Sequence, residues 1–416
     1  MSSLLVRGGR VLDAQAKHFI TADLRLRDAV VRDPKGDVLP QDVDAAGCLV
    51  VPAFTDLTAT LRCPQDPDTQ TPDELRAAAR RGGFTTVICA PTSGPGQVPA
   101  GFSTDERAAA FQHLLASAAP SEIRLDAAPA PLGAAELGEI WSMVRGRGAT
   151  VLRLLESTDD ALLLRRALEC ARAADAVVML PSVDARLSHK AVLVESAVST
   201  RLGLSAVPEA SEAIGVCRIL ELAALTGARV HIAHIFTARG IALVEQAQRD
   251  GLRVSACVAA LHLLLDERSH LARPYDTALR IWPPLPTQNA REALIDAVIR
   301  GTLCVSSGHG PAPKRERDLE MALATPGVAT LELLLPALLP ILGEQALVEA
   351  LAMRPAAVLR RPTSLTTGAR QDLLVIDPKP TTTFMDGPLR GLAGNGRIRA
   401  LITGGIVEEH QLETAQ

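Results

Sequence analysis

The fold is decided by a stretch close to the N-terminus, Val51-Pro52-Ala53-Phe54-Thr55-Asp56-Leu57-Thr58-Ala59-Thr60-Leu61-Arg62-Cys63-Pro64. Its apolar residues predict a buried strand, and the period of two along a strand places Thr58 and Thr60 on one face. The stretch also separates two kinds of sequence. Before it, short alternating segments around a Gly8-Gly9 turn predict a small β unit. After it, short apolar runs alternate with segments rich in Ala, Leu, Arg and Glu.

This alternation continues to about residue 360 and is typical of a (β/α)8 TIM-type barrel. Helices are predicted over 161–173 and over 208–226, the second with a proline at its start. Short strands return near the C-terminus. We therefore predict an α/β fold in which residues 1–50 and 361–416 form the two halves of a small β-sandwich and residues 51–360 form the barrel.

Composition limits the classes of partner. The net charge of -4 and the lack of a Lys/Arg block interleaved with aromatic residues argue against nucleic acid. The seven cysteines are scattered without a CxxC pair, which favours reduced thiols. The N-terminus lacks the apolar core of a signal peptide, and Pro336 and Pro340 interrupt the most apolar stretch, Leu331 to Leu342. We expect a cytoplasmic protein that does not bind a membrane.

The stretch from Val51 to Pro64 resembles the signature P-G-F-x-D-x-H-x-H-x-R-x-P of the dihydroorotase branch of the cyclic amidohydrolases. The resemblance continues through Gly82 to Val87, the Pro326-Gly327 turn and the closing strand at 368–377. It implies a metal-dependent hydrolase fold, yet Thr58 and Thr60 stand where the family has two metal-binding histidines. A neutral hydroxyl is a far weaker ligand than an imidazole nitrogen.

Other positions that the resemblance assigns to the metal site also differ. The strand at 150–156 carries Arg153 but neither the lysine nor the aspartate of the family, Pro181 replaces a ligand histidine, and Gly308 replaces the aspartate that binds metal and shuttles a proton. Of the ligand positions, His234 alone matches. The resemblance therefore predicts no metal and no cofactor.

Two further residues match the family less clearly. Arg62 corresponds to a residue of the carboxylate-binding set, and it is either a remnant anion site or part of a structural ion pair. His309 lies in Ser306-Ser307-Gly308-His309-Gly310-Pro311-Ala312, where the family reads T-D-H-A-P-H, and a packing role is favoured for it.

These substitutions lead to the hypothesis of a chain that is not an enzyme. The resemblance implies a dihydroorotase-like subunit that supports the assembly and stability of an aspartate carbamoyltransferase holoenzyme in pyrimidine biosynthesis. Its expected partner is the catalytic chain of that transferase, in a complex of about six chains of each kind, with self-association also expected.

Three alternatives remain open at this point. One is a cyclic amidohydrolase of the dihydroorotase, hydantoinase or allantoinase type with a residual or unusual metal site. Another is a metal-independent enzyme built from Cys63, His234 and His309. The last is a protein that binds an anionic pyrimidine intermediate through Arg62.

Overall fold

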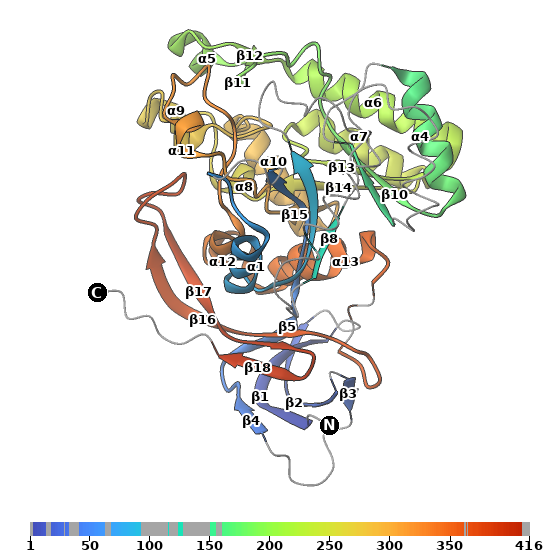
Figure 1. The fold of residues 1–416 in the computed structure, drawn as a ribbon, viewed down its shortest axis with the longest axis vertical. Helices are drawn as coiled ribbons and strands as arrows, with labels where there is room; N and C mark the ends of the chain where they lie inside the picture. The colour runs from blue at the N-terminus through green and yellow to red at the C-terminus, as the bar shows by residue number, and fades with distance from the viewer. Residues whose placement is uncertain are drawn as a thin grey trace.

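The computed structural model describes residues 3–13, 18–28, 30–32, 41–62, 68–92, 115, 124–127, 150–154, 160–361, 363 and 365–409. Figure 1 shows a barrel surrounded by helices above a β-sheet unit that contains both ends of the described chain. A long hairpin, made of β16 (Leu373–Thr383) and β17 (Ala393–Thr403), leaves the sheet unit and runs up beside the barrel.

Parallel strands form the barrel wall in two arcs. A three-stranded arc has the order β6-β7-β8, and a five-stranded arc has the order β15-β14-β13-β10-β9. Every pairing within these arcs is parallel. The strands are β6 (Phe54–Arg62), β7 (Phe84–Thr92), β8 (Arg124–Ala127), β9 (Val151–Arg153), β10 (Val177–Pro181), β13 (Arg229–Ala233), β14 (Val254–Ala259) and β15 (Leu303–Ser306).

Helices cover the outer face of these strands and begin and end at recognisable signals. The predicted helices at 161–173 and 208–226 are confirmed as α4 (Ala161–Ala173) and α6 (Glu209–Thr226), the latter preceded by Pro208 and ended by Gly227 in the left-handed conformation. The other helices are α1 (Pro72–Arg81), α5 (Ala197–Leu202), α7 (Ala238–Arg249), α8 (Leu261–Leu264), α9 (Ser269–Ala272), α10 (Gln288–Arg300), α11 (Lys314–Arg317), α12 (Leu334–Val348) and α13 (Arg354–Val358). The predicted α/β barrel is confirmed.

The sheet unit joins the two ends of the chain. Its eight strands follow the order β18-β17-β16-β5-β1-β2-β3, with β4 paired to β1. The junction is the antiparallel pairing of β16 with β5 (Leu49–Pro52), in which Leu374 lies opposite Val51. The remaining strands are β1 (Ser3–Asp13), β2 (His18–Arg27), β3 (Val30–Arg32), β4 (Gln41–Asp44) and β18 (Ile406–Glu409). Because β5 leads directly into β6, this sheet anchors the first barrel strand.

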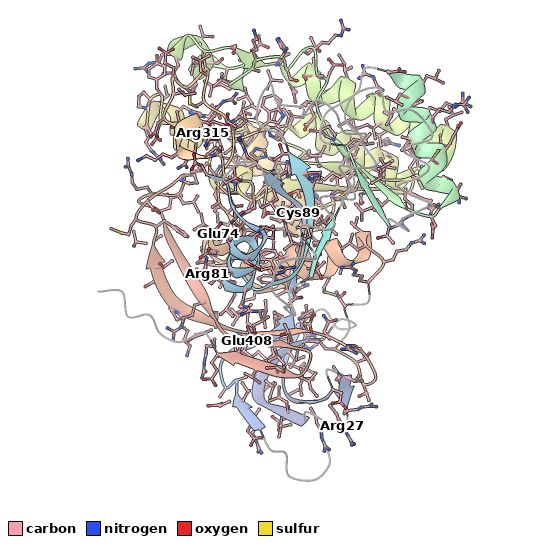
Figure 2. The ribbon with its side chains drawn as sticks, viewed as in Figure 1. Arg27, Glu74, Arg81, Cys89, Arg315 and Glu408 are labelled. Carbon is pink, nitrogen blue, oxygen red and sulfur yellow. The ribbon has the colours of Figure 1, made fainter. Side chains whose placement is uncertain are left out.

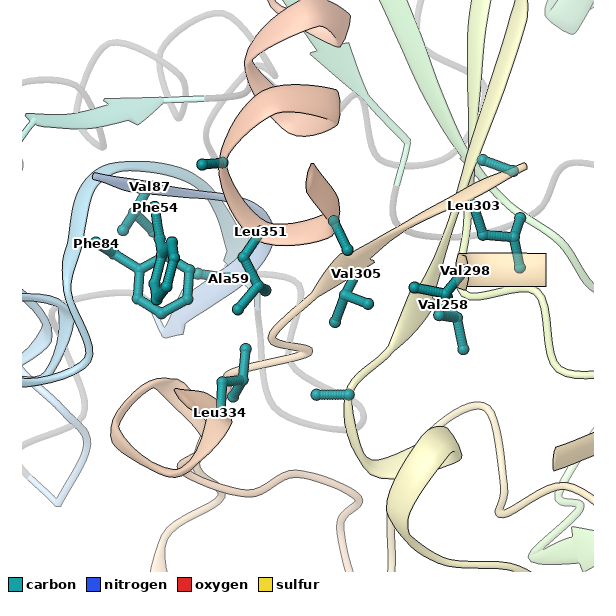
Figure 3. Close-up of a cluster of buried hydrophobic side chains, with 14 of the residues drawn as sticks. Phe54, Ala59, Phe84, Val87, Val258, Val298, Leu303, Val305, Leu334 and Leu351 are labelled. Atoms are coloured by element: carbon teal, nitrogen blue, oxygen red, sulfur yellow. The ribbon is translucent and has the colours of Figure 1, made fainter. Parts of the chain in front are cut away.

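The core is mainly aliphatic, and Figure 3 shows the part of it next to β6 and β7. Phe54 and Phe84, which begin these strands, pack with their ring centroids 5.6 Å apart at an interplanar angle of 59°. Leu334 and Leu351 lie beside them in the same buried cluster. This packing fixes the bottom of β6, so that its upper end is presented to the barrel mouth.

Among the residues that the structure describes, one helical region is apolar enough to span a membrane by length and composition, from Leu331 to Val358. Half of its most apolar window is buried inside the protein. Gly343, at φ 72° and ψ 169°, interrupts the helical geometry, and Leu338 and Leu351 belong to the main core. We assign this region to the packing between barrel and hairpin; the cytoplasmic location stays a prediction.

Candidate functional site

A cavity of about 460 Å³ opens at the mouth of the barrel, where the strands end. Several residues from different strands face it, and they are the positions that the sequence singled out, namely Thr58, Thr60, Arg62, Arg153, Pro181, His234 and Gly308. The fold therefore brings together side chains up to 250 residues apart in sequence, such as Thr58 and Gly308. Trp282 lines the same cavity.

A threonine and a histidine make direct contact at the floor of this cavity. The Oγ1 atom of Thr58 lies 3.0 Å from Nε2 of His234. The same Oγ1 accepts a hydrogen bond of 3.2 Å from the backbone N–H of Gly308, which leaves its own hydrogen available for the imidazole. Burial lowers the pKa of His234 to about 4, so the ring is neutral at physiological pH. A hydroxyl bonded to a neutral imidazole is an arrangement that activates an oxygen nucleophile.

The backbone at His234 is in an unusual conformation that directs this ring. Strand alternation places Ile232 against the helices and His231 inside the barrel, where its Nδ1 lies 2.9 Å from the Oγ of Ser255. Continued alternation would turn His234 outward. Instead its φ is +57°, which is uncommon for a residue with a side chain, and the ring turns into the cavity. The side chains of His231 and His234 therefore both lie on the inner side of the barrel.

A buried glutamate holds the segment that follows His234, and sequence reasoning did not identify it. The carboxylate of Glu212 on α6 accepts hydrogen bonds from the backbone N–H groups of Phe236 and Thr237, each at 2.9 Å, and from the Thr237 hydroxyl. Ser182 adds a bond of 3.2 Å from its Oγ to the carbonyl of His234. Burial raises the pKa of Glu212 to about 7, although these donors act in the opposite direction.

Gly308 occupies a position where an aspartate would be strained. Its φ is +63°, in the left-handed region that favours glycine. An added Cβ would meet Ala259 and His234 at ordinary contact distances of 3.6 and 3.9 Å, so space is available and backbone conformation is the obstacle. The local backbone, as well as the side chain, therefore differs from what an aspartate at this position prefers.

Arg62 forms a bidentate ion pair at the rim of the cavity. Its Nη1 and Nη2 atoms lie 2.6 and 2.7 Å from the two carboxylate oxygens of Glu316. This pairing lowers the pKa of Glu316, mainly through the hydrogen bond to Arg62. Of the two possibilities for Arg62, the geometry favours the structural ion pair.

His309 points away from the cavity. Its Nδ1 accepts a bond of 3.0 Å from the N–H of Thr330, so Nε2 carries the hydrogen and donates to Oε1 of Gln70 at 2.9 Å. The residue is 1% exposed and burial lowers its pKa to about 4. Cys63 lies outside the described residues. The trio of Cys63, His234 and His309 is thus not assembled by the part of the chain that the structure describes.

The side chains at the mouth do not fit the metal pair of the cyclic amidohydrolases. Thr58 and Thr60 present neutral hydroxyls, Pro181 and Gly308 have no donor atom, and His234 is already bonded to Thr58. Within the described ranges no group of three His, Cys, Asp or Glu side chains could hold a metal ion. Since catalytic metal sites generally need about three protein ligands, no reaction step is assigned to a metal here.

Sequence comparisons give relatives that align with almost the whole chain. A dihydroorotase of Syntrophotalea carbinolica is 32% identical over 396 residues, covering 90% of this chain and 89% of its own. One of Anaeromyxobacter dehalogenans is 32% identical over 443 residues and covers 98% of both. A dihydroorotase-like protein of Pseudomonas aeruginosa is 29% identical, with 98% and 100% coverage. No model of a known protein family matches the chain.

Solved structures with the same fold include hydantoinases. A D-hydantoinase (dihydropyrimidinase) from Thermus sp. superposes with a TM-score of 0.81 at 19% identity, over 97% of this chain and 94% of its own. The L-hydantoinase (dihydropyrimidinase) from Arthrobacter aurescens also gives 0.81 at 19% identity, over 98% and 96%. At this level of identity the likeness concerns the fold.

The relatives correct one prediction of the sequence analysis. The substitutions at 58, 60, 181 and 308 led to the expectation that the chain is not an enzyme, whereas the relatives at 32% identity, which cover nine tenths or more of it, are named dihydroorotase, a hydrolase. The inference was wrong because it took the loss of metal ligands as the loss of every reactive side chain at the barrel mouth. The hydroxyl of Thr58 and the imidazole of His234 remain within hydrogen-bond distance of each other.

Identity above 30%, together with coverage of at least nine tenths of this chain, exceeds what a shared barrel fold alone would produce. The signature around Thr58 and the closing strand at 368–377 fall within the aligned region, which spans nearly the full length of both proteins. This chain belongs to the dihydroorotase family of cyclic amidohydrolases.

Proposed function

We propose that this protein hydrolyses a cyclic amide through Thr58 and His234, without the metal pair of the family. The observation that carries the proposal is the contact of 3.0 Å between Thr58 Oγ1 and His234 Nε2 at the floor of the cavity. Family membership supports the substrate class, since cyclic amidohydrolases open ring amides. The volume of about 460 Å³ is within the usual size of a small-molecule site.

The reaction can be written with the residues of this chain alone. His234 takes the hydroxyl proton of Thr58 as the Oγ1 atom attacks the carbonyl carbon of the ring amide. The tetrahedral intermediate collapses, the ring C–N bond breaks, and the leaving nitrogen receives the proton from His234. Water then attacks the Thr58 ester with His234 again acting as base, which releases the open-chain acid and restores the hydroxyl. The low pKa of His234 keeps the base unprotonated at neutral pH.

The test is a ring-opening assay on the purified full chain after exhaustive chelation. We expect slow hydrolysis of dihydroorotate, dihydrouracil or hydantoin that persists without metal and is not increased by zinc. Metal content is measured on the same samples. Near-stoichiometric zinc that is required for turnover would favour the alternative with an unusual metal site. A complete lack of turnover with every substrate, with and without metal, would reject hydrolysis by this site.

A second proposal concerns the surface. We propose that the protein also associates with the catalytic chain of aspartate carbamoyltransferase, about six chains of each, and with itself. Exposed apolar side chains support an interface: Tyr275, Leu319 and Leu323 are 54%, 47% and 67% exposed. Leu319 and Leu323 flank Met321 in the sequence, and Met321 is buried in a small cluster with Leu193. The Tyr275 hydroxyl donates to the carbonyl of Leu202, which packs against this cluster.

Co-expression of the two chains tests this association. We expect one large species on gel filtration, and replacement of Leu319 and Leu323 by serine should separate it into smaller components. Elution of the two unmodified chains as separate species at micromolar concentration would reject the proposal. Replacement of Leu225 by serine is the matched control, because this leucine is equally exposed, at 62%, but lies on α6.

A further inference from the structure

We propose that Arg153 is the anion-binding residue of the cavity and takes the carboxylate of a cyclic amide that carries one. The inference deepens the proposed function, because it assigns a substrate class to the same cavity. Arg153 ends strand β9, lines the cavity and is 7% exposed. A cation held at that depth is costly unless an anion accompanies it.

The hydrogen bonding of Arg153 leaves donors for a ligand. Its Nη1 donates to the carbonyl oxygen of Ala59 at 2.7 Å. Among the described residues, this carbonyl is the acceptor for the Arg153 side chain. A guanidinium has five N–H donors in a planar fork, so most of them remain for a group in the cavity. A carboxylate fits this fork because its two oxygens can accept parallel hydrogen bonds.

Three titratable groups, Asp56, Cys89 and Cys257, lie close enough to act on the charge of Arg153. Asp56 is fully buried, but its two oxygens accept bonds of 2.6 and 2.7 Å from the backbone N–H and Oγ of Ser307. Burial also raises the pKa of Asp56, which weakens it as a counter-ion. Cys89 is buried on β7 (Figure 2), and burial raises its pKa to about 12, so that it is neutral. Cys257 is the other thiol nearby; burial acts to raise its pKa, but a hydrogen bond from Cys304 and the nearby imidazoles lower it. Arg153 donates its hydrogen bond to Ala59 rather than to any of these three groups.

The arginine that the family resemblance assigned to the carboxylate is not available. Arg62 sits at the rim in its bidentate pair with Glu316, and a ligand would have to displace a carboxylate already bound at 2.6 and 2.7 Å. Arg153 is therefore the better placed cation, because its hydrogen bond to Ala59 leaves other N–H groups of the guanidinium for a ligand. Thr58 and His234 line the same cavity, so an anion on Arg153 would hold a ring close to them.

Calorimetric titration of the full chain tests the assignment by binding, independently of turnover. The probes are L-dihydroorotate, which carries a carboxylate, and dihydrouracil, which has the same ring without it. We expect dihydroorotate to bind more tightly, and Arg153→Met to weaken it about 10- to 100-fold, the usual effect of losing a charged hydrogen bond. Dihydrouracil affinity should change little. Arg153→Lys should keep part of the dihydroorotate affinity, because lysine retains the positive charge but lacks the planar guanidinium that can donate two parallel hydrogen bonds.

The control is Arg165→Met, which removes an exposed arginine from the outer face of α4. Thermal unfolding shows whether each variant is folded. If Arg153→Met does not fold, the assignment is tested with Arg153→Lys and with the ratio of the affinities of the unmodified chain for dihydroorotate and dihydrouracil. Equal affinity for both probes, or unchanged dihydroorotate binding in a folded Arg153 variant, would overturn the assignment. Carboxylate-dependent binding without ring opening would reject the hydrolysis by Thr58 and His234 and leave the anion site standing.

Discussion

Replacing Thr58 by valine is expected to lower the rate of ring opening by about 10² or more, because it removes the nucleophile and with it the proton transfer to His234. Valine keeps the shape of the side chain and removes the oxygen that lies 3.0 Å from His234 and 3.2 Å from the N–H of Gly308. The affinity for dihydroorotate should change far less than the rate, because the hydroxyl acts on the reacting carbonyl. Steady-state kinetics gives kcat and KM separately, and calorimetry gives the affinity.

Two further measurements separate a chemical role of Thr58 from a structural one. Thr58→Ser keeps the hydroxyl and should retain most of the activity. The pH profile should be flat from about pH 5 to 8 and fall only as pH approaches 4, since the pKa of His234 is lowered to about 4 and the base must be unprotonated. A rate that rises through neutral pH would contradict His234 as the base, as would equal activity of the valine and serine variants.

Replacing Glu212 by alanine is expected to destabilise the fold by about 3 kcal/mol or more, because buried hydrogen-bond donors lose their acceptor. The carboxylate binds the N–H groups of Phe236 and Thr237 at the start of α7. Gly240 shows how tightly this site is built, since an added Cβ there would lie 2.3 Å from a Glu212 oxygen. Chemical denaturation measures the free energy of unfolding. Glu221→Ala is the matched control, because Glu221 is exposed on the same helix.

The pH dependence of stability gives a second readout for Glu212. Its pKa is about 7 in the folded protein against an ordinary value of 4.5, so the folded state holds the proton more tightly. This contribution is fully present below pH 4.5 and is lost as pH rises to about 7. Buried neutral histidines act oppositely: the pKa values of His234 and His309 are lowered from 6.5 to about 4, so their contribution is lost as pH falls through that window.

The difference in unfolding free energy between the unmodified chain and Glu212→Gln isolates the glutamate from the histidines. This difference should become smaller as pH rises from 4.5 to 7. A difference that is constant over the range would contradict a raised pKa at Glu212. Activity of the same variant should also fall, because the segment that follows His234 loses its support at Phe236 and Thr237.

The barrel, and several of the residues at its mouth, could be predicted from the amino-acid sequence. Alternating apolar runs and helical segments indicate the parallel strands because backbone hydrogen bonding and burial impose these periods locally. The stretch from Val51 to Pro64 was sufficient to indicate the family, and with it which positions would meet. Thr58, Pro181, His234 and Gly308 do line one cavity. The prediction that the chain is not an enzyme was wrong, because a count of lost metal ligands does not show which of the remaining side chains are in contact.

The contacts between these residues form only in the folded chain. The bond between Thr58 and His234 depends on a φ of +57° at His234, which strand alternation does not predict. Hydrogen bonds from Ser182 and to Glu212 hold the same segment. The pairing of Arg62 with Glu316, and the remaining donors of Arg153, likewise depend on residues distant in sequence. Periodicity fixes which face a residue is on, whereas hydrogen-bond partners and pKa shifts are set by side chains that the chain brings together only on folding.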